Sequence, residues 1–247
     1  MVDSGQVSAT LRLSVGDIRL AYPMTVPAGP VPATAVVPAL QGLVNAVVEA
    51  AEQRAKGMGK SVSCRKGCGA CCRQLVPISR TEGERLLAVV EGLPKDRRAA
   101  VETRFAEAEA ALAGAALDEM LLDPERRTGR TDRELSLAYF ALRLPCPFLE
   151  EESCSIHPER PLVCREYLVT SPAELCAGPQ QEGVTPLPVP KLSPVARRLQ
   201  GDADAWFPLA LLLAWRRRRA PASIERAGIK RTGPDWVQRF LRKLGSG

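Results

Sequence analysis

Eight cysteines, all between Cys64 and Cys176, are the residues of this chain with the clearest capacity for chemistry. Four of them fall within nine residues, in the run Cys64-Arg-Lys-Gly-Cys68-Gly-Ala-Cys71-Cys72. The other four follow at Cys146, Cys154, Cys164 and Cys176. Thiolates are soft ligands that select zinc or iron–sulfur clusters, and four of them close a tetrahedral site. The two groups therefore predict a metal centre where they converge.

Two other roles compete for the first cysteine group. Positions 64, 68, 71 and 72 fall on one side of a helix, where cysteine would pack as a small apolar residue. However, Gly67 and Gly69 interrupt any such helix, and neighbouring basic residues add charge to it. A disulfide framework is disfavoured because no export signal is visible, and because bridging the adjacent Cys71 and Cys72 would strain the bond. Metal binding is the interpretation that we prefer.

The charge of such a centre predicts cations around it. Four thiolates around Zn²⁺ or a [4Fe–4S]²⁺ core leave a net charge of about −2. Five cations lie within a few residues of a cysteine, and each is equally compatible with a solvated surface: Arg65, Lys66, Arg73, Arg160 and Arg165. The only histidine, His157, also lies in the second group, either as a ligand or packed beside the site.

The cysteine pattern resembles a known family. Cys-x₃-Cys-x₂-Cys-Cys, followed by Cys-Pro-Phe-Leu and Cys-Ser-Ile-x₃-Arg-Pro-x₂-Cys-Arg, is similar to the YkgJ-type cysteine-cluster family over about residues 60–170. The resemblance implies a zinc- or iron-chelating domain whose metal site uses Cys64, Cys68, Cys71, Cys72, Cys146, Cys154 and Cys164. Cys176 lies beyond the strongest part of the motif and is the eighth candidate ligand. Relatives often carry Tyr in place of His157, which weakens the case for His157 as a ligand.

We carry three hypotheses for function. The first is a metal-binding protein with a structural, electron-transfer or metal-handling role, in which the number of thiolates favours an iron–sulfur cluster, such as [4Fe–4S], over zinc. Two Cys₄ zinc sites would also use all eight cysteines. The second is an iron–sulfur-dependent group-transfer enzyme. It is either methyltransferase-like, by resemblance to the cysteine cluster of flagellin lysine methylases, or a radical SAM enzyme, by the spacing of Cys64, Cys68 and Cys71. Ala70 stands where radical SAM motifs usually have an aromatic residue.

The third hypothesis is a nucleic-acid-binding metalloprotein that uses the basic C-terminus. Residues 216–247 hold ten basic and two acidic residues, a net charge of +8, which leaves −2 for the remaining residues of this +6 chain. Residues 216–243 are therefore a candidate surface for an anionic partner, either nucleic acid or a membrane. The competing explanation is a docked amphipathic helix with solvated charges. The sequence identifies no protein partner. It contains no Ser elbow or phosphate loop, so an enzyme of the ordinary acid–base or triad type has little support. Whether the chain is an enzyme of another type stays open.

Composition limits the class of protein. The chain has 247 residues, 45% of them hydrophobic but only 4% aromatic, which excludes collagen-like and wholly disordered proteins. The longest apolar stretch, 206–215, is about half of the roughly 20 residues that span a membrane. With no visible signal peptide, we expect a cytoplasmic protein.

The periodicity predicts a mostly helical α+β protein in three segments. Residues 1–38 are expected to form an N-terminal β-hairpin (8–26) and a Pro-rich linker. Residues 39–200 are expected to form an irregular, metal-stapled cysteine-cluster domain, with helices near 40–57, 86–93, 101–112 and 135–142. An apolar stripe from Leu40 to Ala51 marks the first of these helices, and Ser79 with Glu82 predicts a capping box before the second. Residues 201–247 are expected to form a basic helical extension: a buried helix over 202–219, and a last helix that begins near Pro234.

Overall fold

The structure is a computed structural model that describes residues 5–127, 129–178, 182–201, 205–218, 225 and 228–245. It confirms the α+β, mostly helical class, with the N-terminal β-hairpin and C-terminal helices that the sequence predicts. Within the described residues the strands form small antiparallel pairs rather than one large sheet: β1–β2, β3–β8, β4–β7 and β5–β6. Helices and loops therefore carry most of the packing.

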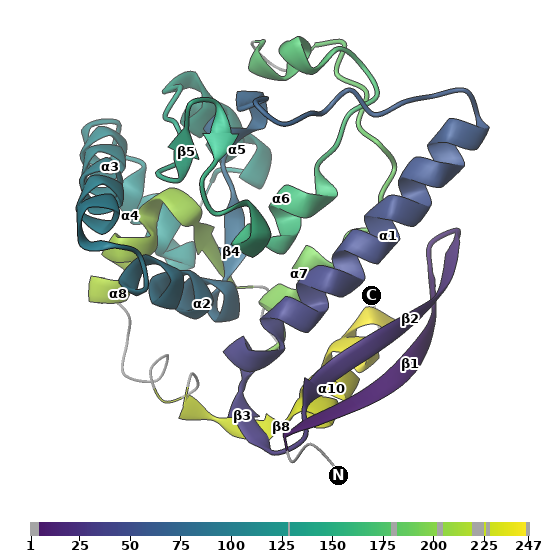
Figure 1. Ribbon diagram of the computed structural model, residues 1–247. Helices are drawn as coiled ribbons and strands as arrows, with labels where there is room; N and C mark the ends of the chain where they lie inside the picture. Colours follow the sequence, from purple (N-terminus) through teal and green to yellow (C-terminus); the bar gives the residue numbers. More distant parts are fainter. Residues whose placement is uncertain are drawn as a thin grey trace.

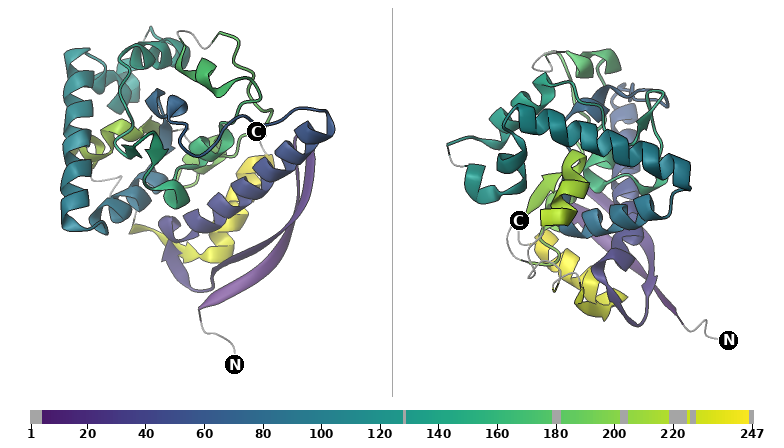
Figure 2. Two further views of the ribbon diagram at one scale, coloured as in Figure 1. Left: turned by 45° about the horizontal axis from the view of Figure 1, so that its top comes forward. Right: turned by 90° about the vertical axis from the view of Figure 1, so that its left-hand side faces the viewer.

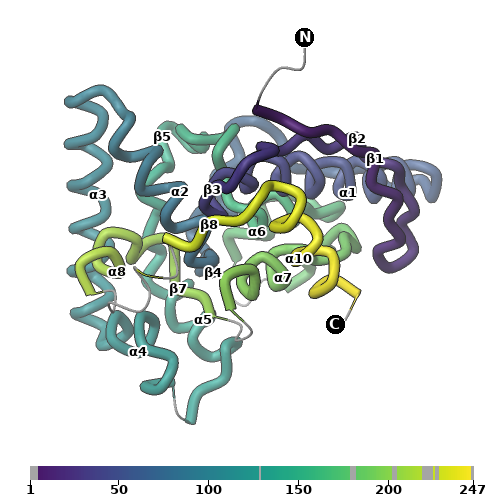
Figure 3. Tube along the Cα trace, turned by 90° about the horizontal axis from the view of Figure 1, so that it is seen from below, coloured from purple at the N-terminus to yellow at the C-terminus, as the bar shows by residue number. Residues whose placement is uncertain are grey.

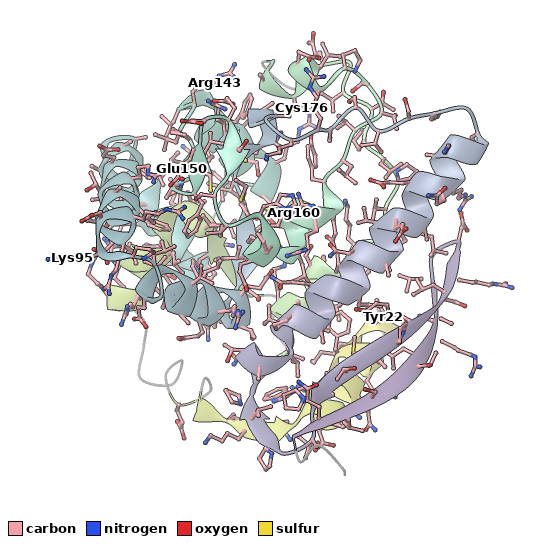
Figure 4. All side chains as sticks on the ribbon, viewed as in Figure 1. Tyr22, Lys95, Arg143, Glu150, Arg160 and Cys176 are labelled. Carbon is pink, nitrogen blue, oxygen red and sulfur yellow. The ribbon has the colours of Figure 1, made fainter. Side chains whose placement is uncertain are left out.

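The hairpin consists of β1 (Gln6–Val15) and β2 (Ile18–Pro27), and it lies along the long helix α1 (Val37–Gly57) in Figures 1 and 2. Gly16 makes the turn with φ of 56°, so that Val15 pairs with Ile18. Alternate hairpin residues are buried, among them Met24 and Val26. Figure 4 places Tyr22 between β2 and α1.

One core joins the two ends of the chain. It combines the hairpin, α1, α7 (Ser193–Arg197) and α10 (Gly233–Gly245), with buried Trp236 and Phe240 supplied by α10. Strand β3 (Pro30–Pro32) pairs with β8 (Lys230–Thr232), and the Trp236 indole donates to the Val31 carbonyl at 2.9 Å. Figure 3 shows β3, β8 and α10 close together. This core includes residues from all three predicted segments, whose division stays a prediction.

The other helices surround two further cores on the opposite side of α1 (Figure 1). They are α2 (Arg80–Glu91), α3 (Lys95–Gly114), α4 (Asp118–Leu122), α5 (Asp132–Ala141) and α8 (Leu212–Arg218). The capping box predicted at Ser79 and Glu82 is present, and Glu82 also accepts from the Leu162 backbone N–H at 2.8 Å. Glu82 therefore ties the start of α2 to the cysteine region.

The prediction of a continuous helix over 202–219 is wrong for the first part of this segment. Strand β7 (Trp206–Pro208) pairs with β4 (Pro77–Ser79), a 3₁₀ turn η7 (Leu209–Leu211) follows, and only then does α8 begin. Pro208 explains the difference, because proline lacks the N–H and clashes with the preceding turn inside a helix. Residues 202–204 and 219 lie outside the described residues.

Two other parts of the chain hold features that the sequence analysis did not predict. The Pro-rich linker contains β3 and the 3₁₀ turn η1 (Ala33–Val36). Among the described residues, one helical stretch, Ala33–Gly57, is long and apolar enough to cross a membrane by length and composition. Half of its most apolar window is buried inside the protein, so it serves here as a core helix.

Three arginines at the start of the basic run, at positions 216 to 218, pair with acidic side chains. Arg216 contacts Glu91 of α2 at 2.7 Å, and Arg217 contacts Glu109 of α3 at 2.5 Å. Arg218 contacts both Glu119, at 2.5 Å, and Asp118, at 3.5 Å, in α4. Such partly exposed pairs contribute little stability individually. These three arginines are nevertheless not free cations, and α10 docks its apolar face on the first core; an anionic partner at 216–243 stays a prediction.

Replacing Gly233 with alanine is expected to destabilise the protein by about 1–3 kcal/mol, the usual cost of overpacking a core. A Cβ at Gly233 would overlap the Pro27 carbonyl oxygen and lie 2.8 Å from the Val26 Cβ. The matched control is Gly245→Ala at the other end of α10, where a Cβ meets nothing within 4 Å. Urea unfolding of both variants measures the effect, and equal stabilities would contradict the packing described here.

Candidate metal centre

The first cysteine group is held in a chain of tight turns. Gly67 adopts φ of 85°, and the Cys68 N–H donates to the Arg65 carbonyl at 3.1 Å. The 3₁₀ turn η2 (Ala70–Arg73) then carries Cys71 and Cys72. A Cβ at Gly69 would lie 2.9 Å from Leu149 Cδ1, so glycine allows this turn to approach β5.

The second cysteine group folds directly onto the first. The Cys146 N–H donates to the Cys72 carbonyl at 2.7 Å, and the Ser63 N–H donates to the Val169 carbonyl at 3.0 Å. Cys154 lies on β6 (Ser153–Cys154), which pairs with β5 (Leu149–Glu150), and Cys164 lies on α6 (Leu162–Glu166). The turn η5 (Ala173–Ala177), which carries Cys176, contacts η2. The structure thus brings together the two groups that the sequence separates.

Electrostatic interactions divide the thiols into two sets around Cys71. Burial is the main reason why the pKa of Cys164 is well above its usual range, and the charges of Cys146, Cys71 and Cys154 raise it further. Burial raises the pKa of Cys146 to about 12, with further contributions from Cys154 and Cys71. We define the central set as Cys71, Cys146, Cys154 and Cys164.

The outer set consists of Cys64, Cys68 and Cys176. Burial raises the pKa of Cys176 first, and the charges of Cys64, Cys71 and Cys68 raise it further. Burial likewise raises the pKa of Cys64, to which Cys71 and Cys68 add. A hydrogen bond donated to Cys72 is the largest cause of the raised pKa of Cys71. Cys71 therefore lies within electrostatic reach of both sets and in direct contact with Cys72.

Tyr167 is a site residue that the sequence analysis missed. Its hydroxyl donates to the Cys176 sulfur, an interaction that lowers the Cys176 pKa against the larger effect of burial. Gln74 Nε2 donates to the same hydroxyl at 3.5 Å. Figure 4 labels Cys176 near the upper edge of the molecule. An aromatic residue three positions after Cys164, in a chain poor in aromatics, is the signal that could have found it.

The cations predicted to surround the metal centre differ in the partners that their side chains contact. Arg73 forms a two-point ion pair with Glu152, at 2.6 and 2.9 Å, and Arg65 lies 3.8 Å from Glu174 on the exposed surface. Lys66 is also exposed. Arg165 is buried and donates to Asn45 Oδ1 and to the carbonyls of Pro158 and Arg160. These four cations have protein partners or lie in solvent.

His157 lies at the start of η4 (His157–Glu159) and is exposed. Burial of part of the ring lowers its pKa, and the charges of Arg160 and Arg165 lower it further. His157 is therefore neutral at pH 7, and it lies on the side of the site where cations gather.

The described cysteines are all free thiols. No group of three or more His, Cys, Asp or Glu side chains in the described part of the chain has the arrangement of a ready-made metal site. The donor set nonetheless fits a soft metal, because eight thiols from two segments share one region and few carboxylates interact with them.

Two folded cysteine segments with eight free thiols define a cysteine-cluster domain of the metal-chelating class. Residues 63–183 match the CxxCxxCC family, described as "Putative zinc- or iron-chelating domain", and the match spans all eight cysteines. The match lies in the family that the cysteine pattern predicts. No curated protein and no solved structure gives a match.

Proposed function

We propose that this protein binds an iron–sulfur cluster or zinc through its clustered cysteines, with a structural, electron-transfer or metal-handling role. The observation that carries the proposal is the packing of two distant segments, which together hold eight free thiols, against each other at η2. The proposed ligands are drawn from Cys64, Cys68, Cys71, Cys72, Cys146, Cys154, Cys164 and Cys176. We also propose a cytoplasmic location, where thiols stay reduced and available for metal.

The central set is the best candidate for one complete centre. Its four thiols suffice for a Cys₄ zinc site or for a [4Fe–4S] cluster. Cys146 and Cys154 pack against the second core, so this set is partly shielded from solvent by Phe148 and Ile156. Burial at the edge of a core supports a stable centre rather than a transient surface site.

The outer set and Cys72 offer further thiols beside this centre. They could hold a second metal ion or receive metal before it reaches the central set. A zinc ion would fix the two segments as a structural clamp, whereas an iron–sulfur cluster would supply a one-electron carrier. We favour the iron–sulfur cluster because eight thiols exceed the needs of one zinc site.

Metal analysis tests the proposal. The full chain is purified without oxygen, and iron, acid-labile sulfide and zinc per chain are measured together with the visible absorption spectrum. Iron and sulfide in equal amounts, with a brown colour, would support the cluster, and zinc without sulfide would support the zinc form. A colourless, metal-free, folded monomer that keeps eight free thiols and takes up neither metal would overturn the proposal.

A further inference from the structure

Arg160 differs from the other cations of the cysteine region because it is partly buried and its side chain has no hydrogen-bond or ion-pair partner in the described part of the chain. Its Nε atom is buried and makes no hydrogen bond, although the residue as a whole is only partly buried. A buried donor without a partner costs free energy, and a charged one costs more. Such an arrangement points to a partner that joins the site later.

The backbone holds Arg160 firmly in this position. Its carbonyl accepts from Gln41 Nε2 at 3.2 Å and from Arg165 Nε at 2.9 Å, which ties it to α1 and α6. In Figure 4 Arg160 lies beside α6, between β5 and α1. Pro161 follows it and restricts its backbone further.

The groups around the guanidinium are thiols and other cations. Its charge lowers the pKa values of Cys71, Cys154 and Cys164, against the larger effects that raise them. Its charge also acts on His157 and Arg165, which are cationic or neutral and cannot neutralise it. The neighbouring carboxylate of Glu159 is already held by Arg85 in a two-point ion pair, at 2.7 and 3.0 Å. The thiols of the central set are therefore the groups within electrostatic reach that can become anions for Arg160.

We propose that Arg160 is the positioning cation of the metal centre, and that its guanidinium donates hydrogen bonds to thiolate sulfurs of the central set once metal has displaced their protons. The inference rests on the proposed function and names one residue outside its ligands. Hydrogen bonds and a positive charge beside the sulfurs stabilise a centre of net negative charge. The same guanidinium lacks a partner while the thiols stay protonated.

The test is a titration with Co²⁺, which tetrahedral thiolate sites bind with a visible spectrum, in the presence of a competing chelator. Arg160→Gln is expected to weaken Co²⁺ binding by about 10- to 100-fold, the usual effect of losing a partner of metal ligands, and to shift the sulfur-to-cobalt charge-transfer band. Arg160→Lys keeps the charge and is expected to recover part of the affinity. The matched control is Arg65→Gln, which removes an exposed charge beside Cys64 that lies 3.8 Å from Glu174, and it should keep the wild-type affinity.

Unfolding of the metal-free protein separates this role from a merely structural one. Arg160→Gln should leave the metal-free protein as stable as the wild type or more so, because it removes an unpaired buried donor. Equal Co²⁺ affinity in Arg160→Gln and the wild type would overturn the role of Arg160 as the positioning cation. Strong destabilisation of metal-free Arg160→Gln would also overturn it. Stabilisation of the metal-free wild type by inorganic phosphate, lost in Arg160→Gln, would instead assign Arg160 to a soluble anion. A wild-type protein that binds neither Co²⁺ nor another metal would overturn the proposed function itself.

Discussion

Replacing Cys71 with serine is expected to remove more bound metal than any other single cysteine substitution. Cys71 is within electrostatic reach of both thiol sets, and it also contacts Cys72. Serine keeps the size of the side chain but offers a hard oxygen in place of a soft sulfur. The loss of metal affinity should exceed the roughly 100-fold effect that is typical of losing a residue that hydrogen-bonds a metal ligand. Metal per chain and a chelator competition measure it.

The matched control for Cys71→Ser is Cys64→Ser, because Cys64 belongs only to the outer set. We expect Cys64→Ser to keep the metal of the central set, and Cys71→Ser to lose it. Far-UV circular dichroism of both metal-free variants checks that the fold survives. If the two variants lose the same amount of metal, the division into two sets is wrong; if neither loses any, Cys71 is not a ligand.

The affinity for metal is expected to rise steeply with pH between about 6.5 and 8.5. Burial raises the pKa of Cys146 to about 12, and the pKa values of Cys71 and Cys164 are also raised. The metal-free protein therefore carries protonated thiols at neutral pH, and a metal must displace these protons. Each proton released contributes a factor of about ten in affinity per pH unit. Competition titrations over this range, with proton release followed in weak buffer, measure the effect.

The same pKa shifts predict the opposite trend for the stability of the metal-free protein. In the unfolded chain the thiols have their ordinary pKa of 9.0, whereas burial in the folded protein raises the pKa of Cys146 to about 12. Between these values the folded state binds more protons, so stability is present below pH 9 and is lost as the pH rises through this window. Urea unfolding at pH 8 and pH 10 checks the sign. A metal affinity independent of pH, or a metal-free protein more stable at pH 10, would contradict these pKa values.

Local signals in the sequence predicted much of the helical framework. The apolar stripe from Leu40 to Ala51, the capping box at Ser79 and Pro234 near the start of α10 are short-range features, and each appears where it was expected. The strand pairs β3–β8 and β4–β7 were not predicted. They join residues about 130 to 200 positions apart through three-residue strands, which leave no periodic pattern in the sequence.

The cysteines were recognised because their spacing and context form a specific motif, and the family match confirms that motif. Their grouping was beyond prediction, because it depends on how β5–β6, α6 and η5 fold onto η2. The different roles of the cations were equally hidden. Arg73 and Arg160 look alike in the sequence, but Arg73 pairs with Glu152 and donates to the Gly69 carbonyl, whereas the Arg160 Nε is buried without a partner.

The core shared by the two ends of the chain affects how the protein is made on the ribosome. The hairpin and α1 are synthesised first, yet Trp236 and Phe240 of α10 complete their apolar packing. The N-terminal half therefore keeps apolar surface exposed until α10 has been translated. By then every cysteine has been translated, so the proposed metal-binding segment is fully synthesised before the first core can close.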